Sequence, residues 1–471
     1  FLTEAANRGS ISTGYDIEYS NKFESDNSEG ITRNYDASTG ANCIANNSTT
    51  NAKKFTVSYW VKKTELLASG QNIPWIAIAG GNATVVKFQD EKFAAYDDSA
   101  GWDLKTNAVF RDTSAWYHLV CAVDTTQSTA SDRVNLYVNG VLQTSLENEN
   151  YGTQNNDNQL WKVSTSHTIG NQAYFKGGYI AELHCIDGTQ YAASDFGEYD
   201  DSGIWIPKEA DVTYGDQGYY LNWSDFGSAN SNANNTGIGK DHSGNTNPFV
   251  NLDNWSSADI ATDTPTNNFC TWSPNWVYAT NRTISEGGTK LTGSSAWGGC
   301  KGSIGVTNGK WYWENKAAGN DTIVGWQTAN EDYTVSGNAH NLKSTIAFYE
   351  GGNYIWIKDS TSGRNDSSVS GTYAGSQVVG FALDLDSSPQ TATFYRNGSA
   401  IASDVNIDGL ADKTIFPFIA QYNQNTESNF GGCTSMSNTH TNTDQNGYGS
   451  FVYTPPSGYY AICTKNLAEY G

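Results

Sequence analysis

The stretch Phe55-Thr56-Val57-Ser58-Tyr59-Trp60-Val61 decides the fold class. Its odd-numbered positions are apolar, and this period of two is that of a β-strand with one buried face. Similar runs follow, with turn residues between them, at residues 74–78, 116–123, 133–138 and 179–184. Strands roughly ten residues apart and separated by turns are typical of an antiparallel β-sandwich. The sequence therefore predicts an all-β protein.

Two Asn-Gly dipeptides, Asn139-Gly140 and Asn397-Gly398, each end a predicted strand. Asn-Gly is the strongest short hairpin signal, because both central residues of such a turn need a positive φ. The second dipeptide belongs to another β region, which begins near Trp276. A strand–Asn-Gly–strand hairpin late in each half suggests two related sandwiches.

The segment from Ser228 to Asn247 is rich in Gly, Ser and Asn, a composition typical of a linker. We therefore expect two antiparallel β-sandwiches with an extended N-terminal arm. The expected parts are an arm at residues 1–54, a jelly roll at 55–225, an Asn/Gly-rich connector at 226–275 and a second sandwich at 276–471.

The composition excludes several classes of protein. The chain has 471 residues, of which 15 are Trp, 28 Tyr and 18 Phe, and this aromatic content indicates packed cores rather than disorder. The net charge of −22 repels phosphate backbones and anionic lipid, so we expect no nucleic-acid binding. No run of 18 apolar residues is present, so we expect no membrane insertion.

The seven Cys are widely spaced and form no CxxC pair, which argues against a zinc knuckle or a redox motif. Cys121 and Cys463 lie in apolar runs, and we expect them to be small buried hydrophobes. The chain starts with Phe1 and carries no signal pattern or initiator Met, which predicts a processed chain or a fragment.

The first half resembles a concanavalin A-like, laminin-G-type jelly roll, through residues 54–63, 114–120, 133–140 and 175–183. The second half resembles a SPRY sandwich, through residues 309–314, 324–326, 380–384, 394–398, 416–418, 429–431 and 458–464. The two in this order, joined through 218–225, 241–245 and 263–269, are similar to virion proteins of marine tailed phages.

This resemblance implies a protein on the virion surface, as part of a tail fibre, a capsid fibre or a capsid decoration. Other virion proteins are the implied partners, and a homo-oligomer, with a trimer as one form, is an expectation from the resemblance. It implies no single biochemical activity, because both sandwiches are folds that host many functions.

A glycosidase would need two carboxylates flanking the scissile bond. The spacing E-x-D-x-x-E occurs at Glu24, Asp26 and Glu29, but polar residues lie between them, and a solvated loop is expected there. Glu182 and His184 share a strand face, for which we expect exposure to solvent. The sequence also lacks GxSxG, HExxH and P-loop motifs, so we expect no enzyme.

Calcium is a conceivable cofactor, because hard cations bind clustered oxygen atoms and laminin-G-type domains sometimes hold calcium in a rim loop. Asp97, Asp98 and Asp103 are the candidate ligands, and Asp200-Asp201 is a second acidic cluster. Solvated surface turns are the alternative interpretation of these acids.

Carbohydrate binding is the positive hypothesis. A sugar site combines an exposed aromatic ring with Asn, Asp or Gln groups that bond the hydroxyls. Trp102, Trp161 and Trp297 have loop contexts of this kind and are the candidate contacts, with burial against a sandwich edge as the alternative. Core positions are expected for the strand tryptophans Trp60, Trp116, Trp311, Trp313 and Trp326.

Three functions therefore remain open. The first is non-catalytic attachment of a virion surface protein to host-surface polysaccharide, with many weak sites acting together. The second is a purely structural capsid decoration or fibre protein, for which a large apolar patch on one sandwich would be the sign. The third is a polysaccharide depolymerase, which would need carboxylates from distant segments brought together by the fold.

Overall fold

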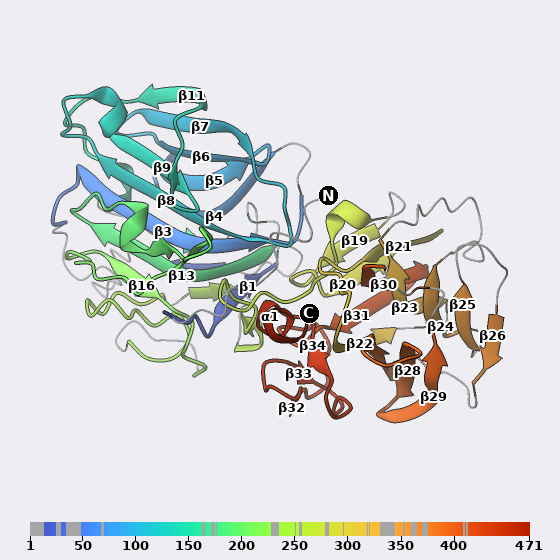
Figure 1. Ribbon diagram of the computed structural model, residues 1–471. Coiled ribbons are helices and arrows are strands. Elements are labelled where there is room, and N and C mark those ends of the chain that lie inside the picture. Colours follow the sequence, from blue (N-terminus) through green and yellow to red (C-terminus); the bar gives the residue numbers. More distant parts are fainter. Residues whose placement is uncertain are drawn as a thin grey trace. The chain divides into compact units, whose positions relative to one another are not determined.

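The computed structural model describes two compact units, one within residues 14–112 and 116–266 and the other formed by residues 267–471 together with Thr113–Ala115 (Figure 1). The described residues are 14–24, 30–33, 49–66, 70–162, 165–170, 175, 177–227, 235–249, 251–253, 257–277, 282–294, 296–317, 319, 321–329, 344–351, 354–358, 365–369, 375–407, 410 and 413–471. Within these ranges, no helix has the length and apolar character needed to span a membrane.

The first unit contains two large antiparallel sheets. One has the order β10 (Val141–Leu142), β9 (Val134–Val138), β8 (Trp116–Asp124), β3 (Lys54–Lys63), β13 (Gly178–Asp187), β1 (Ser20–Phe23) and β18 (Ile260–Ala261), with β16 (Tyr219–Leu221) also pairing with β13. The other has the order β11 (Leu146–Tyr151), β7 (Trp102–Val109), β6 (Lys92–Asp97), β5 (Asn82–Gln89), β4 (Gln71–Ala79), β12 (Ser166–Ile169), β2 (Gly30–Arg33) and β17 (Asn251–Asp253).

Shorter elements complete the first unit. The hairpin β14 (Gly197–Tyr199) and β15 (Trp205–Pro207) forms a small sheet of its own. Single 3-10 turns occur at η1 (Ala130–Asp132), η2 (Gln159–Trp161), η3 (Ala193–Asp195) and η4 (Ser257–Asp259).

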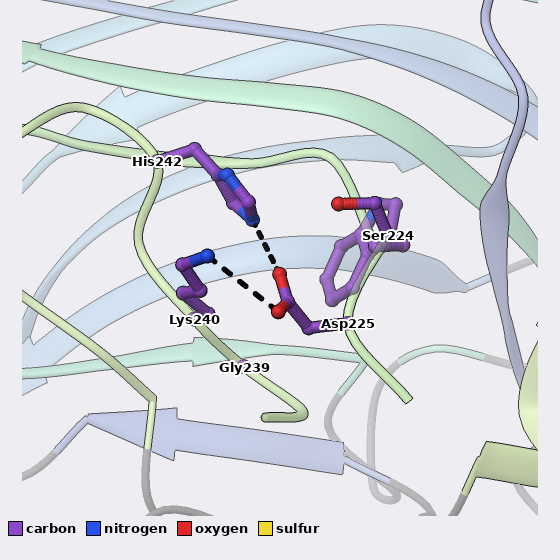
Figure 2. A pocket seen from close by; sticks show the side chains of 6 residues that line it. Ser224, Asp225, Gly239, Lys240 and His242 are labelled. Carbon is purple, nitrogen blue, oxygen red and sulfur yellow. Dashed lines mark hydrogen bonds and ion pairs between the residues drawn. The ribbon is translucent and has the colours of Figure 1, made fainter. Parts of the chain in front are cut away.

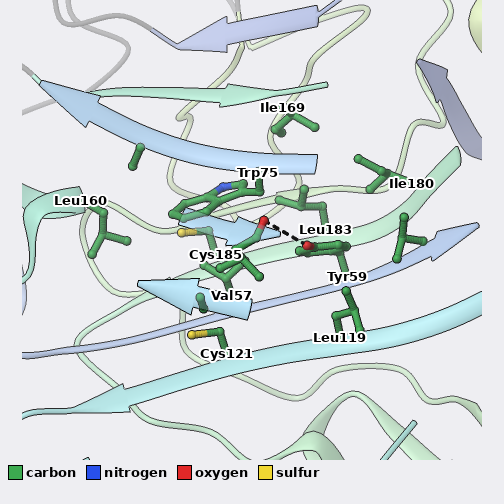
Figure 3. Packing of buried hydrophobic residues seen from close by; sticks show 14 of the residues in the cluster. Val57, Tyr59, Trp75, Leu119, Cys121, Leu160, Ile169, Ile180, Leu183 and Cys185 are labelled. Atoms are coloured by element: carbon green, nitrogen blue, oxygen red, sulfur yellow. Dashed lines mark hydrogen bonds between the residues drawn. The ribbon is translucent and has the colours of Figure 1, made fainter. Parts of the chain in front are cut away.

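The core of this unit is filled from both sheets, which makes it a sandwich. Val57 and Tyr59 of β3 lie in one buried cluster with Leu119 of β8 and Trp75 of β4 (Figure 3). Three polar groups inside the cluster form a chain of hydrogen bonds. The Trp75 indole donates to the Tyr219 hydroxyl at 2.8 Å, and that hydroxyl lies 3.2 Å from Nδ1 of His167.

Both faces of the central strands are buried, which corrects the prediction of a half-buried strand at 55–61. Every residue from Phe55 to Lys63 in β3 is buried, although apolar residues dominate only one face. Phe196 and Ala193 lie in a second cluster with Val120, Ala122 and Ile186, on the face of the sheet away from the main core. The chain after β13 therefore covers the face that the alternation assigned to solvent.

Residues expected to form an arm and a connector belong to the first sandwich. β1 and β2, from the predicted arm, pair with β13 and β12. β18 and β17, from the predicted connector, pair in turn with β1 and β2. Strands this short carry too little periodicity to be recognised from sequence, so the sequence predicts an arm and a connector where these four strands lie.

The second unit is also a sandwich of antiparallel sheets. One has the order β19 (Arg282–Ser285), β20 (Lys290–Gly293), β31 (Asn425–Asn429), β22 (Lys310–Ala317), β27 (Val378–Asp384), β28 (Thr391–Arg396) and β29 (Ser399–Asn406), and β34 (Tyr460–Ala461) adds a parallel pairing to β22. The other has the order β21 (Trp297–Lys301), β30 (Ile415–Tyr422), β23 (Thr322–Thr328), β24 (Thr345–Tyr349), β25 (Tyr354–Lys358) and β26 (Asn365–Ser368). The remaining elements are η5 (Pro274–Trp276), the hairpin β32 (Asn442–Thr443) with β33 (Ser450–Phe451), and α1 (Thr464–Tyr470).

Aromatic rings dominate the core of the second unit. Trp313 stacks on Phe381 with ring centroids 4.5 Å apart and on Phe430 at 5.3 Å. Trp326 meets Trp313 edge to face at 6.2 Å. Burial of the five strand tryptophans is confirmed, as is burial of Cys121 and Cys463. The six Cys within the described residues are all free thiols.

The two Asn-Gly hairpins are confirmed. Asn139 and Gly140 have φ of 47° and 79°, and Asn397 and Gly398 have 48° and 77°. These values are those of a type I′ turn, whose twist matches that of the flanking strands. β9 pairs with β10 and β28 with β29 across these turns, as the sequence predicts.

Gly140 offers a test of the covering layer, because an added Cβ would lie 2.4 Å from the Trp205 ring as well as requiring a positive φ. We expect Gly140→Ala to lower the free energy of unfolding by about 2–4 kcal/mol, through backbone strain and overpacking together. Gly101→Ala is the matched control, since its φ is +75° and no atom lies within 4 Å of the new Cβ. Chemical denaturation of both variants measures the difference, and equal losses would contradict contact with Trp205.

Candidate functional site

Trp102 lies in the core of the first unit, which corrects the expectation that it meets a sugar from a loop. It is the first residue of β7 and is 1% exposed. Its indole donates to Asn158 Oδ1 at 3.0 Å, and its ring lies 6.2 Å from Phe55. With no face of the ring open to solvent, it cannot stack on a ligand.

Trp161 ends the 3-10 turn η2 and is half-buried. Its ring packs against the main core and lies 5.6 Å from the ring of His167, at an angle of 35°. The loop position is thus as expected, but much of the ring is used for packing.

Trp297 lies at the surface of the second unit, at the start of β21. It lies opposite Tyr422 of the neighbouring strand β30, and their ring centroids are 6.1 Å apart. Its ring also lies 6.4 Å from Tyr349, which ends β24. We call Trp297, Tyr349 and Tyr422 the aromatic surface. Trp297 and Tyr349 are half-buried, and Tyr422 is 39% exposed.

Small and buried side chains lie on the face of the sheet that carries these rings. Gly299 pairs with Ala420 and Gly325 pairs with Ala347, and the buried side chains Ile323 and Phe418 lie between the two pairs. Trp297 and Tyr349 come from strands that β30 and β23 separate, and their rings pack against the cluster that these buried side chains form. All three rings of the aromatic surface are therefore carried by strands of one sheet.

Polar groups border the aromatic surface. Asn423 follows Tyr422 directly, is exposed and has a φ of 49°. Asp321 precedes β23, and its carbonyl oxygen accepts a hydrogen bond from the Tyr422 amide at 2.9 Å. Rings with amide and carboxylate groups beside them are what a sugar site requires.

The sequence contained a signal for this site that the prediction missed. Aromatic residues in strands were assigned to the core, which left Tyr349 and Tyr422 aside. In β30, however, Ile415 and Ile419 belong to the main core, whereas Phe418 and Ala420 belong to a separate cluster with Trp297. Tyr422 is two residues beyond Ala420, so the period of two of a strand places it on the same outer face.

The structure does not bring the predicted calcium ligands together. Asp97 is buried, and its carboxylate accepts hydrogen bonds from Thr84 Oγ1 and from the amides of Ser99, Ala100 and Gln159. Asp103 pairs with Tyr96 on the opposite side of the sheet from Asp97, and Asp98 is exposed. No cluster of three His, Cys, Asp or Glu occurs in the described ranges.

The other acidic patterns also lie differently from expectation. Asp200 Oδ1 accepts from the amides of Ser202 and Ile204, so this acid closes a surface turn. Glu24 is buried rather than solvated, while Asp26 and Glu29 lie outside the described residues.

Glu182 is buried on the covered face of the first sheet, so the expectation of solvent exposure was wrong. A β-bulge between Ala181 and His184 adds one residue to β13, and Glu182 has a φ of 48°. Continued alternation after Ile180, a core residue, would point Glu182 into the core. The bulge turns it to the outer face instead, at a cost in backbone strain.

Two tyrosines and a histidine surround the Glu182 carboxylate. Glu182 Oε2 accepts from the hydroxyls of Tyr15 at 2.9 Å and Tyr220 at 2.7 Å, and His184 Nε2 lies 3.6 Å away. Burial, followed by the charge of Glu182, raises the pKa of Tyr220, which therefore remains a donor. The carboxylate is hydrogen-bonded by the covering segments, and a small hollow whose lining includes Ser58, His118 and Lys208 adjoins it.

His118, on the same face, is held in a tautomer that cannot activate a nucleophile. Trp205 Nε1 donates to His118 Nδ1 at 3.1 Å, and an indole can only donate. The hydrogen of neutral His118 is therefore on Nε2 and points to Ser58 Oγ, 2.9 Å away. Burial lowers the pKa of His118 to about 3, so the ring is neutral. A nucleophilic serine needs the reverse arrangement.

A small hollow in the first unit holds a charged trio. Figure 2 shows Asp225 between His242 and Lys240, with Asp225 Oδ2 2.8 Å from His242 Nε2 and Oδ1 3.5 Å from Lys240 Nζ. Trp223, Ser224 and Gly239 complete the lining. Since the carboxylate already contacts both bases, the trio offers little charge to a ligand.

Glu314 in the second unit is a buried acid with a structural role. Its carboxylate accepts from the amides of Val452 and Tyr453 at 2.8 and 2.9 Å, which fixes the chain after β33 to β22. The Tyr312 hydroxyl and the Asn429 amide add further bonds. Burial raises the pKa of Glu314 from 4.5 to about 7, against the effect of these donors.

Comparisons with known proteins agree with the β-sandwich architecture. Residues 36–190 match the family model described as the concanavalin A-like lectin/glucanases superfamily. No curated protein matches the sequence. The SPRY domain of human HERC1 has 17% identity and a TM-score of 0.27, and the match covers 35% of this chain and 98% of that domain.

Two further solved structures are similar at the same level. The PSpry domain of TRIM65 has 14% identity and a TM-score of 0.27, covering 34% of this chain and 88% of that one. A human SPRY domain has 12% identity and a TM-score of 0.23, covering 32% of this chain and 94% of that one. The jelly-roll resemblance is thus supported over residues 36–190, in a superfamily whose description includes both lectins and enzymes.

The raised pKa of Glu314 predicts a pH-dependent stability for the second unit. The pKa of Glu314 in the folded protein lies above the ordinary value of 4.5. The contribution of protonated Glu314 to the free energy of unfolding is therefore fully present below about pH 4.5 and is lost as the pH rises through about 7. We expect a loss on the order of 3 kcal/mol, measured by urea unfolding at a series of pH values.

The variant Glu314→Gln removes the titrating proton and should flatten this dependence. Glu350, another buried acid of the unit, has a pKa well above its ordinary value because of burial, so Glu350→Gln serves as the control that keeps the Glu314 contribution. A Glu314→Gln variant with the wild-type pH profile would refute the assignment.

Proposed function

We propose that this protein binds carbohydrate without catalysis, through the aromatic surface of its second unit. The observation that carries the proposal is the gathering of Trp297, Tyr349 and Tyr422 on one sheet face, with Asn423 and Asp321 beside them. Sugars present apolar C–H faces that stack on aromatic rings, and hydroxyls that bond to amides and carboxylates. The match of residues 36–190 to a superfamily of lectins and glucanases also favours a carbohydrate ligand.

The biological setting that we propose is the surface of a phage virion, with host-surface polysaccharide as the ligand. This setting rests on the sequence resemblance of the two sandwiches, in their order, to marine phage virion proteins. Other virion proteins would then be the partners, and copies within a homo-oligomer would act together. Weak single sites become effective in this way, because each bound copy raises the effective concentration of the next.

Attachment without catalysis is favoured over a depolymerase by the chemistry of the first unit. Glu182 accepts two tyrosine hydroxyls and lies under covering segments. Ser58 receives a hydrogen bond from neutral His118 rather than giving up its proton. Neither group is placed as an acid, base or nucleophile would need to be.

A second candidate function, that of a structural module held by protein contacts, has one observation in its favour. Val141 and Leu142 of β10 are 54% and 43% exposed, and Tyr199 and Ile204 are 53% and 41% exposed. The Tyr199 hydroxyl donates to the carbonyl of Asn139, beside these two strand residues. This apolar group, on an edge strand of the first unit, is a surface that another virion protein could cover.

Removal of the Trp297 ring tests the carbohydrate proposal. We expect Trp297→Ala to weaken adsorption to host cells, or to their purified surface polysaccharide, by about tenfold, because a stacking partner is lost. Tyr448→Ala is the matched control, since Tyr448 is an exposed tyrosine of the same unit and lies outside the aromatic surface. Wild-type adsorption that soluble polysaccharide does not compete away would contradict the proposal.

The apolar group is tested by Leu142→Glu. If the group anchors the protein, this charge should reduce incorporation into particles while binding of polysaccharide persists, because Leu142 belongs to the other unit. Particle-associated protein, quantified against the soluble pool, gives the measure. Wild-type incorporation of the variant would exclude this surface as the anchor.

A further inference from the structure

We infer that the aromatic surface selects a single, uncharged glycan chain, an inference that rests on the carbohydrate-binding function proposed above. Two features of the surface carry it. One is the tilt of the three rings relative to one another, and the other is the distribution of charge around them.

The rings of the aromatic surface do not form a plane. Trp297 is inclined by 44° to Tyr422 and by 55° to Tyr349. A flat face of a crystalline polysaccharide would need coplanar rings, each stacked on a sugar of the same plane. Inclined rings instead present faces of different direction, which suits one soluble chain whose successive sugars do the same, and we use the word trough for this set of three inclined rings.

The trough is preorganised. All three rings come from strands of one sheet, β21, β24 and β30, and Trp297 and Tyr349 rest on the buried side chains Ile323 and Ala420. A chain that binds there orders little of the protein, so more of the contact energy remains as affinity. The geometry of the free protein therefore describes the bound state as well.

The neighbouring cations are turned away from the trough. Arg282 Nη2 donates to the carbonyl oxygens of Ala296 and Gln421, and the residue is 8% exposed. Lys301, on the same strand as Trp297, is fully buried and donates to the Thr328 carbonyl at 2.8 Å. Both cationic groups donate hydrogen bonds to carbonyl oxygens of the protein itself, so neither is placed to pair with an acidic sugar.

Acidic groups make the surroundings unfavourable to anions. Asp321 lies beside Tyr422, and the chain as a whole carries a net charge of −22. Within the part of the chain that the structure describes, Arg282 and Lys301 bond the protein's own carbonyls, so a uronate, sulfate or phosphate group on these rings would meet the repulsion of Asp321. An uncharged chain avoids this cost, and its binding should depend little on salt, whereas binding of an anionic chain would improve as salt screens the repulsion.

The test compares three ligands for the full chain by isothermal titration or affinity electrophoresis. They are soluble neutral oligosaccharides of glucose and N-acetylglucosamine, a polyuronate of similar length, and microcrystalline cellulose in a pull-down. We expect the neutral chains to bind at least tenfold more tightly than the polyuronate at an ionic strength of about 0.02 M, with the gap narrowing at about 0.5 M.

Equal or tighter binding of the polyuronate at low salt would overturn the inference, as would capture by the crystalline polymer in preference to soluble chains. A wild-type protein that binds none of the three, nor purified host polysaccharide, would overturn the proposed function itself. The two failures are therefore distinguishable.

The variant Asp321→Lys tests the charge argument directly. It keeps the Asp321 carbonyl that holds the Tyr422 amide and places a cation beside the trough. We expect the ratio of polyuronate to neutral-chain affinity to rise by about tenfold in this variant, and Glu469→Lys, at an exposed acid of α1, should leave the ratio near that of the wild type. An unchanged ratio in Asp321→Lys would contradict the role of charge.

Discussion

The burial of both faces of β3 constrains the whole first unit. A strand whose alternate residues are polar cannot be covered on both sides unless each polar group finds a partner. The structure meets this condition: Ser58 contacts His118, Lys62 contacts Asp263 at 2.6 Å, and the Thr56 hydroxyl donates to the Thr189 carbonyl. These partners lie at residues 118, 189 and 263, so hydrogen bonds and an ion pair tie three other segments of the unit to β3.

This constraint also determines where a ligand can bind. The residues with the richest chemistry, Glu182, His184 and His118, are occupied in fastening the cover, through Tyr15, Tyr220 and Trp205. The outer face of the second sandwich has a different composition. Ile323, Phe418 and two alanines form a small buried cluster on that face, and the aromatic side chains that pack against it remain partly exposed. In this protein the polar cluster around Glu182 stabilises the first unit, whereas the aromatic surface of the second unit is partly exposed to solvent.

Much of the fold could be predicted from the sequence, because periodicity and turn chemistry act locally. The Asn-Gly turns at 139–140 and 397–398 and the core tryptophans of β22 and β23 lie as predicted. The cover over β3 could not be predicted, since an alternating strand does not show that a distant segment will bury its polar face. The prediction for Trp102 was wrong for a related reason. Its Gly and Asp neighbours indicate a loop, but the turn ends at Gly101 and the Trp102 ring lies in the core. Trp297, predicted in a loop, begins strand β21 and is half-buried, and its two partner rings come from strands distant in sequence.

The way in which strands hold the three rings affects how weak individual sites could suffice for attachment. Affinity depends on the contact energy less the cost of ordering the site, and rings held by strands have little left to order. A loop-borne site would lose part of its energy each time it bound, and this loss would recur in every copy of a multivalent array. Rings fixed on β21, β24 and β30 avoid that recurring loss, so the gain from display of many copies acts on nearly the full contact energy of each. A rigid sheet face is therefore a better carrier for a multivalent attachment site than the polar cluster around Glu182, whose carboxylate already accepts two tyrosine hydroxyls.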